Sequence, residues 1–208
     1  MSAAACWRSR HARRRPSVYV LPGLRTRGDR LLNIEASLSG TLAYVLDRMH
    51  AGCKLSDALG EARKLGLTEP DPCADLSGMD VARKLVILTR VGGYPLELEQ
   101  IHVVPLLEHT AAMQGFEEFD AQWAERIAQA QARAERIVYA ACFDGSQAQV
   151  GPLALPAEHP LAQGRGRDNV IALSTQLYSP EPLVVRGPGA GAELTATAVL
   201  SKILAIPG

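Results

Sequence analysis

Carboxylates and a lysine are gathered in a short segment that also contains two prolines and two glycines. The segment reads ARKLGLTEPDPCADLSGMDVARK from Ala62 to Lys84, and its chemically useful side chains are Glu69, Asp75, Asp80 and Lys84. Carboxylates bind polar and cationic groups, and a lysine can donate or accept a proton. The combination predicts a binding site for a polar substrate with a proton donor built into it.

Proline stiffens the loop that carries Glu69. Pro70 and Pro72 each hold their own φ at about −65° and disfavour helix in the residue before them. Glu69 and Asp71 are those preceding residues, so both are expected outside a helix. Glu69 is therefore expected to project from a rigid loop.

A helix is expected to follow this loop, from Met79 to about Arg90. In the run MDVARKLVILTR the apolar residues recur at helical spacing. Ser77 begins S-G-M-D, a capping-box-like pattern in which its hydroxyl would accept the backbone N–H three residues on. Asp80 and Lys84 are four residues apart, so they share one face of the helix.

Two interpretations of this aspartate–lysine pair are open. It could be a solvated ion pair, worth only about 0.3 kcal/mol, which is the commoner outcome for this spacing. The glutamate on the stiff loop and the apolar run LVIL after Lys84 favour the other interpretation. In that case, partial desolvation would let Lys84 exchange protons near neutral pH.

The same segment carries a resemblance to a known family. The run A-x3-G-L-T-x2-D-P-x2-D-L-x-G-x-D-x3-K resembles the signature of homoserine dehydrogenase, and DLSGMDVARKLVIL resembles the form found in bifunctional aspartokinase–homoserine dehydrogenases. Residues 28–49 resemble the family segment in which a strand leads into S-G-T and a helix, and residues 165–199 resemble its closing strands, glycine turn and helix. The resemblance covers roughly residues 28–208.

The resemblance implies an oxidoreductase that interconverts L-homoserine and L-aspartate 4-semialdehyde with NAD(P)H, in threonine and methionine biosynthesis. It implies that Lys84 is the catalytic proton donor and acceptor at the substrate oxygen. A substrate with an ammonium group suits a site rich in carboxylates. The implied substrate-binding residues are two acids that hold homoserine and its amino group, another acid of the same pocket and a small-residue wall: Glu69, Asp80, Asp75, Gly40 and Thr41.

The cofactor implied by the resemblance is NADP or NAD. Its contacts are assigned to a glycine turn after the expected strand PLVVR, with Gly187, Gly189, Ala190 and Gly191 as members. The alternative for this turn is a tight connection before a C-terminal helix. No Gly-rich βαβ unit of the dinucleotide-binding type precedes Gly28, so most of the cofactor-binding half is expected to be missing from this chain.

A second functional hypothesis follows from that missing unit. The chain could be a catalytically silent, truncated homologue that serves only as a folded substrate and dimerisation module. Under either hypothesis the expected partners are the small-molecule substrate and a second copy in a homodimer, with no nucleic acid and no membrane.

The first 27 residues match nothing in the expected family pattern. They contain a basic, acid-poor run of arginines between Arg8 and Arg15. Such a run is compatible with a transit peptide, with a nucleic-acid-binding arm, or with a start foreign to the enzyme, and the last is favoured. The expected compartment is the cytoplasm, or a plastid if the run is a transit peptide.

Composition predicts an ordinary packed interior. The chain has 208 residues, 47% hydrophobic content and a formal net charge of zero, which suffices for one sizeable core. The four cysteines show no CxxC spacing and are expected to be free thiols. The five histidines form no ligand set, so no residue is assigned to a metal.

The remaining pattern predicts interleaved strands and helices. Strands are expected at 31–36, 96–105, 136–143, 149–156, 169–178 and 182–186, with helices at 39–52, 56–64, 79–90, 119–135 and 193–206. Within the fourth helix, Trp123, Ile127 and Ala130 are expected to be buried. The predicted fold class is α/β: an α+β substrate and dimerisation domain with a mixed sheet at 28–164, and the closing piece of an incomplete Rossmann-like nucleotide domain at 165–208, after an unmatched segment at 1–27.

Overall fold

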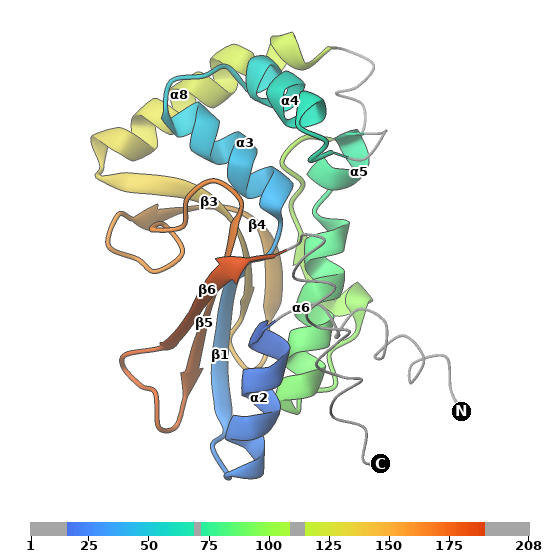
Figure 1. The fold of residues 1–208 in the computed structure, drawn as a ribbon, viewed down its shortest axis with the longest axis vertical. Coiled ribbons are helices and arrows are strands. Elements are labelled where there is room, and N and C mark those ends of the chain that lie inside the picture. The colour runs from blue at the N-terminus through green and yellow to red at the C-terminus, as the bar shows by residue number, and fades with distance from the viewer. Residues whose placement is uncertain (1–15, 69–71, 109–114, 190–208) are drawn as a thin grey trace.

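The structure is a computed structural model, and it describes residues 16–68, 72–108 and 115–189 (Figure 1). Several sequence expectations lie outside these residues. They are the arginine run before residue 16, the stiff loop with Glu69 and Pro70, the turn residues Ala190 and Gly191, and the expected helix at 193–206.

A six-stranded mixed sheet forms the centre of the described chain, in the order β2-β4-β3-β1-β5-β6 (Figure 1). The short strand β2 runs parallel to β4, and every other neighbouring pair is antiparallel. The predicted mixed sheet is confirmed. The strands are β1 (Leu31–Ser37), β2 (Ile101–Val103), β3 (Glu135–Phe143), β4 (Ala148–Pro156), β5 (Asp168–Thr175) and β6 (Leu183–Pro188).

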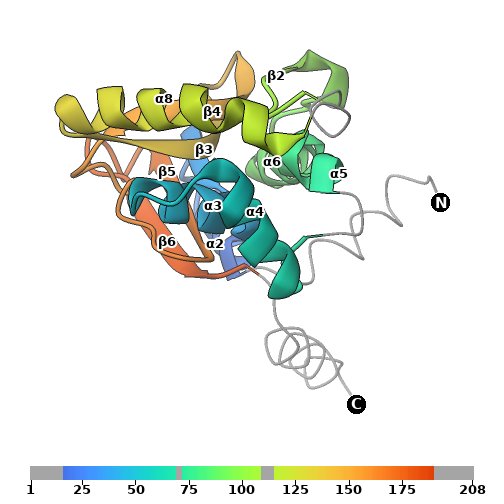
Figure 2. The same cartoon turned by 90° about the horizontal axis from the view of Figure 1, so that it is seen from above.

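Helices pack against one face of this sheet. Helix α8 lies beside β3 and against α3 and α4 (Figure 2), while α6 packs on β3 and β4. The helices are α2 (Pro16–Thr26), α3 (Gly40–His50), α4 (Leu55–Lys64), α5 (Pro72–Leu76), α6 (Met79–Gly92) and α8 (Asp120–Ala132), with short 3-10 turns at Leu98–Gln100 and Phe116–Phe119.

The main core lies between the helices and the sheet. Strand residues Ile34, Ile171 and Leu173 meet the apolar sides of α3 and α6 there, and all three are at most 3% exposed. The opposite face of the sheet carries a smaller buried cluster, in which Leu161 and Ala162 of the β4–β5 connection cover residues of β3 and β5. The predicted stripe on α8 is confirmed, since Trp123, Ile127 and Ala130 are all buried.

The strand expected at 96–105 is mostly wrong. Only Ile101–Val103 pairs with β4, and a 3-10 turn precedes it. A capping box closes this turn, because the Gln100 side chain accepts from the Glu97 backbone N–H at 2.7 Å. The side-chain alternation that suggested a longer strand therefore belongs to a turn with two exposed glutamates.

Two expected helix boundaries also differ. Helix α4 begins at Leu55, and Ser56 binds Asp120 instead of opening the helix, with its backbone N–H and its hydroxyl donating at 2.8 and 2.7 Å. Helix α8 ends at Ala132, because Ala134 adopts a left-handed φ of 55° and turns the chain into β3. Both boundaries depend on contacts or turns that helical periodicity does not report.

The described fold includes residues before 28. Helix α2 packs against α6, and its Leu21 is 2% exposed. At the other end, β5 pairs with β1 and β6 pairs with β5, so the expected division at residue 164 lies within one hydrogen-bonded sheet. The three-part division itself stays a prediction.

None of the helices in the described residues is both long enough and apolar enough to cross a bilayer.

Candidate active site

The ammonium group of Lys84 is directed from α6 at a different element of the fold. Its Nζ donates a hydrogen bond to the carbonyl oxygen of Leu38 at 2.9 Å and forms an ion pair with Asp80, one turn earlier. The Lys84 side chain is 21% exposed, against 58% for Asp80. The pair expected from the sequence therefore exists, and its lysine is drawn out of water toward the β1–α3 connection.

The start of α3 lies beside that connection. Ser39 caps the helix by accepting the Leu42 N–H at 3.2 Å, as its position before the helix predicts. The hydroxyl of Thr41 donates to the carbonyl oxygen of Leu67 at 2.5 Å. A Cβ on Gly40 would lie 3.5 Å from the Arg167 carbonyl oxygen, which is an ordinary van der Waals contact.

The turn between α5 and α6 positions the acids of the signature. Asp75 lies in α5, is half-buried and is engaged in a polar interaction. Helix α5 in turn contacts α3. The capping prediction for Ser77 is wrong in detail, because its hydroxyl accepts from the Met79 N–H, two residues on, and donates to the Ala74 carbonyl. Gly78 takes the N-cap position instead, with a left-handed φ of 75°.

A buried hydroxyl next to Leu67 has no partner in the described part of the chain. The Oγ1 atom of Thr68 is inaccessible to solvent and makes no hydrogen bond to any residue that the structure describes. Buried hydroxyls are nearly always hydrogen-bonded, so an exception of this kind needs a physical explanation. Sequence reasoning missed Thr68 although it lies within the signature, because its burial is not visible in the motif.

The predicted glycine turn begins inside a strand, because Gly187 lies within β6 and only Gly189 of the described residues follows that strand. Asn169 is opposite Gly187 in the β5–β6 pairing, and a Cβ on Gly189 would overlap the Asn169 side-chain amide. Among the described residues, no atom lies within 4 Å of where a Cβ on Gly187 would be. Asn169 is 7% exposed, and its Oδ1 is the other buried side-chain oxygen without a partner in the described residues.

These contacts bring several predicted residues to one place and leave others unplaced. Gly40, Thr41 and Lys84 gather around the start of α3, through the carbonyls of Leu38 and Leu67. Arg167 lies near Gly40, and Asn169, two residues later, pairs with Gly187 on β6. Glu69, Ala190 and Gly191 lie outside the described residues.

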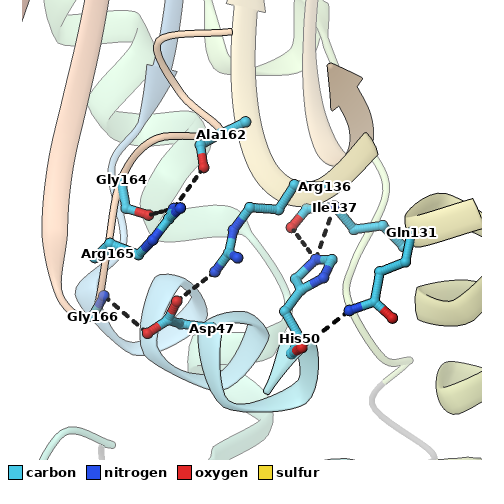
Figure 3. Close-up of polar contacts among 9 residues, drawn as sticks. All are labelled: Asp47, His50, Gln131, Arg136, Ile137, Ala162, Gly164, Arg165 and Gly166. Atoms are coloured by element: carbon cyan, nitrogen blue, oxygen red, sulfur yellow. Dashed lines mark hydrogen bonds and ion pairs between the residues drawn. The ribbon is translucent and has the colours of Figure 1, made fainter. Parts of the chain in front are cut away.

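The far end of α3 carries a separate polar cluster (Figure 3). Asp47 forms an ion pair with Arg136 of β3 and accepts the Gly166 backbone N–H at 3.2 Å. The His50 ring accepts the Ile137 N–H at 2.9 Å. Burial lowers the pKa of His50, and the charge of Arg136 lowers it further. This cluster ties the helix to β3 and to the β4–β5 connection.

Cysteine and metal chemistry find no support in the described residues. Cys53 and Cys142 are free thiols, in agreement with the spacing. Burial raises the pKa of Cys142 to about 12, with a smaller contribution from the charge of Glu35, so this thiol stays protonated and unreactive. The described residues contain no cluster of three or more histidine, cysteine or acidic side chains arranged to hold a metal ion.

Comparison with known sequences supports one family. The sequence model of the family described as homoserine dehydrogenase matches residues 16–204. The match includes residues 16–27, which were expected to resemble nothing in the family. The chain is 43% identical over 199 residues to the bifunctional aspartokinase/homoserine dehydrogenase 2, chloroplastic, of Zea mays, covering 91% of this chain and 22% of the relative. It is 38% identical over 196 residues to the bifunctional aspartokinase/homoserine dehydrogenase 2 of Escherichia coli K12, covering 90% and 24%. The chain thus spans about a fifth to a quarter of the length of these relatives.

Two solved structures with a similar fold are described as homoserine dehydrogenases. A putative homoserine dehydrogenase from Archaeoglobus fulgidus has a TM-score of 0.71 at 28% identity, over 88% of this chain and 53% of that one. A hyperthermophilic archaeal homoserine dehydrogenase mutant in complex with NADPH has a TM-score of 0.67 at 26% identity, over 91% and 51%.

Proposed function

This chain belongs to the homoserine dehydrogenase family, and we propose that it acts in the interconversion of L-homoserine and L-aspartate 4-semialdehyde with NADP or NAD. The reaction would serve threonine and methionine biosynthesis. The proposed role of this chain is to bind the amino-acid substrate and to transfer a proton at its oxygen.

The position of Lys84 is the observation that carries the proposal. Its ammonium is held by the Leu38 carbonyl and the Asp80 carboxylate, in a mostly buried position beside the start of α3. A substrate oxygen within hydrogen-bonding reach of Nζ would exchange its proton with the lysine. In the oxidation direction the neutral amine of Lys84 takes the hydroxyl proton of homoserine and becomes the ammonium, and in the reduction direction the ammonium gives a proton to the carbonyl oxygen of the semialdehyde and becomes the neutral amine.

The acids around the lysine suit the ammonium group of the substrate. Asp80 pairs with Lys84 and is also open to solvent, so it can hold a second cation. Asp75 and Glu69 are proposed to complete the binding of the amino group. Gly40 and Thr41 are proposed to form the small wall of the site, where Gly40 leaves room and Thr41 is already fixed by Leu67.

A dinucleotide is proposed to lie against the glycine turn. No atom of the described residues lies within 4 Å of where a Cβ on Gly187 would be, and the unpartnered Oδ1 of Asn169 lies under Gly189. We propose Gly187, Gly189, Ala190 and Gly191 as cofactor contacts. When bound, the nicotinamide supplies the acceptor or donor of the hydride that leaves or joins the substrate carbon. The NADPH complex of the archaeal homoserine dehydrogenase is consistent with this cofactor class.

A lysine substitution tests the proposal. Homoserine-dependent reduction of NADP+ or NAD+ is measured for the chain and for Lys84→Ala. We expect the turnover number to fall by about 10²-fold or more, because a positioned proton donor contributes that much. Lys64→Ala, in the last turn of α4, is the matched control and should leave turnover unchanged.

The alternative function gives a different result in the same assay. A folded chain that binds L-homoserine in a calorimeter, but shows no turnover with either dinucleotide, would act only as a substrate and dimerisation module. A folded chain with neither binding nor turnover would contradict both proposals.

We also propose a homodimer. Strand β6 is one of the two outer strands of the sheet, and apolar side chains on it and on the preceding hairpin are exposed, with Leu177 at 75% and Val184 at 42%. An exposed edge of this kind favours pairing with another chain. Light scattering should give twice the monomer mass, and Leu177→Asp should reduce it, whereas Leu65→Asp at an exposed position of the α4 end should not.

The proposed compartment is the cytoplasm, with a plastid as the alternative. The maize relative is named as chloroplastic, which favours the plastid for a chain of plant origin. A fluorescent fusion at the C-terminus of the chain would distinguish the two compartments.

A further inference from the structure

A buried tyrosine of β3 touches the first residue of the signature helix. Tyr139 is 2% exposed and is among the largest fully buried side chains of the described chain. A Cβ on Gly78 would overlap the Tyr139 hydroxyl and would lie 2.9 Å from its Cζ atom. Only a residue without a side chain can cap α6 while this tyrosine keeps its place. The left-handed φ of Gly78 adds a second, independent reason for glycine.

The hydroxyl of the same tyrosine holds residues 104–106, called here the Val104 strap, which reach the end of α5 next to the turn before α6. Tyr139 donates to the carbonyl oxygen of Val104 at 2.8 Å. The Val104 N–H donates to Val150 of β4 at 2.8 Å, and the Leu106 N–H donates to the carbonyl oxygen of Leu76 at 2.9 Å. Residues 104–106 thus connect the sheet, the tyrosine and the turn between α5 and α6.

These contacts fix where α6 begins relative to the sheet. Asp80 and Lys84 lie two and six residues after Gly78 on that helix, so their height above the sheet depends on where the helix starts. The hydrogen bond from Lys84 to Leu38 spans from α6 to the β1–α3 connection, and its geometry requires that height to be right. Burial raises the pKa of Tyr139, so its hydroxyl stays protonated and keeps donating across the working pH range.

We propose that Tyr139 is a positioning residue for Lys84: it seats the N-terminus of α6 through Gly78 and through the Val104 strap, and so places the lysine beside Leu38. The proposal deepens the function proposed above and rests on Lys84 being the proton donor. Tyr139 is proposed to act through α6, since its side chain is only 2% exposed. A purely structural tyrosine would contribute to stability and leave the environment of Lys84 unchanged in the folded protein.

The first test measures Lys84 directly and needs no turnover. The full chain and Tyr139→Phe are acetylated with acetic anhydride over a pH series, and modification of the Lys84 peptide is followed by mass spectrometry, with circular dichroism to confirm folding. We expect the midpoint of the Lys84 profile to move by about half a pH unit or more, which is roughly threefold in neutral amine at fixed pH.

Tyr94→Phe is the matched control for the loss of a hydroxyl. Tyr94 follows the C-terminal end of α6, and its hydroxyl donates to the Leu31 carbonyl at 2.7 Å, in the same kind of bond. This variant should leave the Lys84 profile unchanged. The proposal is overturned if Lys84 in folded Tyr139→Phe titrates as in the parent chain, or if both tyrosine variants move it equally.

A steric test keeps the proposal falsifiable if Tyr139→Phe folds poorly. Gly78→Ala places a methyl group against the Tyr139 hydroxyl, whereas Gly93→Ala introduces the same left-handed strain at the other end of α6, where the nearest atom is 3.6 Å away. Gly78→Ala should lower the melting temperature more than Gly93→Ala and should move the Lys84 profile. The double variant Gly78→Ala/Tyr139→Phe should recover part of both losses, because the clashing oxygen is gone. Simple additivity of the two changes would contradict the contact.

Turnover distinguishes this inference from the proposed function. If the parent chain is active, Tyr139→Phe should lower kcat more than it raises KM for homoserine, because a displaced proton donor weakens the chemical step. If the parent chain is inactive, the proposed function fails, and the acetylation profiles still decide whether Tyr139 positions Lys84.

Discussion

The polar groups at the C-terminal end of helix α3 have partners, whereas a hydroxyl beside its N-terminal end has none in the described residues. At the C-terminal end, Asp47 binds Arg136 and the Gly166 N–H, and His50 binds the backbone of Ile137 (Figure 3). At the N-terminal end, the bonded hydroxyl of Thr41 lies beside Leu67, and the next residue, Thr68, buries a hydroxyl with no partner in the described chain.

The difference indicates that the two ends of α3 have different roles. Satisfied polar contacts between distant segments stabilise the fold, whereas a buried hydroxyl without a partner costs about 1–3 kcal/mol. A ligand that supplies the missing hydrogen bond would offset that cost. The C-terminal end is therefore interpreted as a structural tie, and the N-terminal end, with Lys84 beside it, as the place where a ligand binds.

Removal of the structural tie should have the largest effect on stability. Asp47→Ala leaves the mostly buried guanidinium of Arg136 without its carboxylate and frees the Gly166 N–H. We expect the free energy of unfolding in urea to fall by about 2 kcal/mol, as for hydrogen bonds to charged groups. Asp57→Ala, at an exposed position of α4, should change it by about 0.5 kcal/mol or less. L-homoserine affinity should stay the same in both variants, and a large loss in folded Asp47→Ala would break the comparison.

Substitution of Thr68, whose hydroxyl has no partner in the described residues, should change the free energy of unfolding in the opposite direction. Thr68→Val replaces the buried Oγ1 with a methyl group of similar size. We expect the free energy of unfolding to rise by about 1 kcal/mol, while L-homoserine or dinucleotide binding weakens. Thr89→Val is the matched control, because the Thr89 hydroxyl is buried and donates to the backbone of Leu85 or Val86. That control should lose stability, and a loss of stability in Thr68→Val as well would show that the hydroxyl has a partner.

The smallest expected effect is a pH dependence of the free energy of unfolding, which arises from His50 at the C-terminal end of α3. Burial and the neighbouring Arg136 lower the pKa of His50 in the folded state. The unfolded chain therefore takes up this proton first, at about pH 6.5. The free energy of unfolding should fall as the pH drops below that value, until the folded pKa is passed. Two other charged groups near the ring also affect the His50 pKa: Asp47 raises it, and Arg165 lowers it, as Arg136 does.

A histidine substitution isolates this contribution. In His50→Gln the free energy of unfolding should fall less steeply with decreasing pH below about pH 6.5 than it does in the parent chain. His102→Gln, at an exposed position of β2, should keep the parent slope. Urea unfolding at a series of pH values measures both, and identical slopes in all three proteins would show that His50 does not contribute.

Local pattern predicted the regular elements well where one face of an element is buried. The stripe of Trp123, Ile127 and Ala130 on α8 and the adjacent strands β3 and β4 follow from periodicity within each segment. The prediction failed for most of 96–105, where a local capping box forms a 3-10 turn, and for the caps of α4 and α6, although α6 begins at Met79 as predicted. Ser56 binds the distant Asp120 and Gly78 caps α6, and neither contact is visible in the spacing of apolar residues.

The sequence by itself determined the family, the mixed sheet and the identity of Lys84 and Asp80 as a pair on one helical face, because these depend on residue types at short, regular spacing. The tertiary structure decided what that pair can do. It brought the Leu38 carbonyl to Lys84 across 46 residues of sequence, and it placed Tyr139 against Gly78. Contacts of this kind depend on how the sheet and helices pack in three dimensions, and no local pattern encodes that packing.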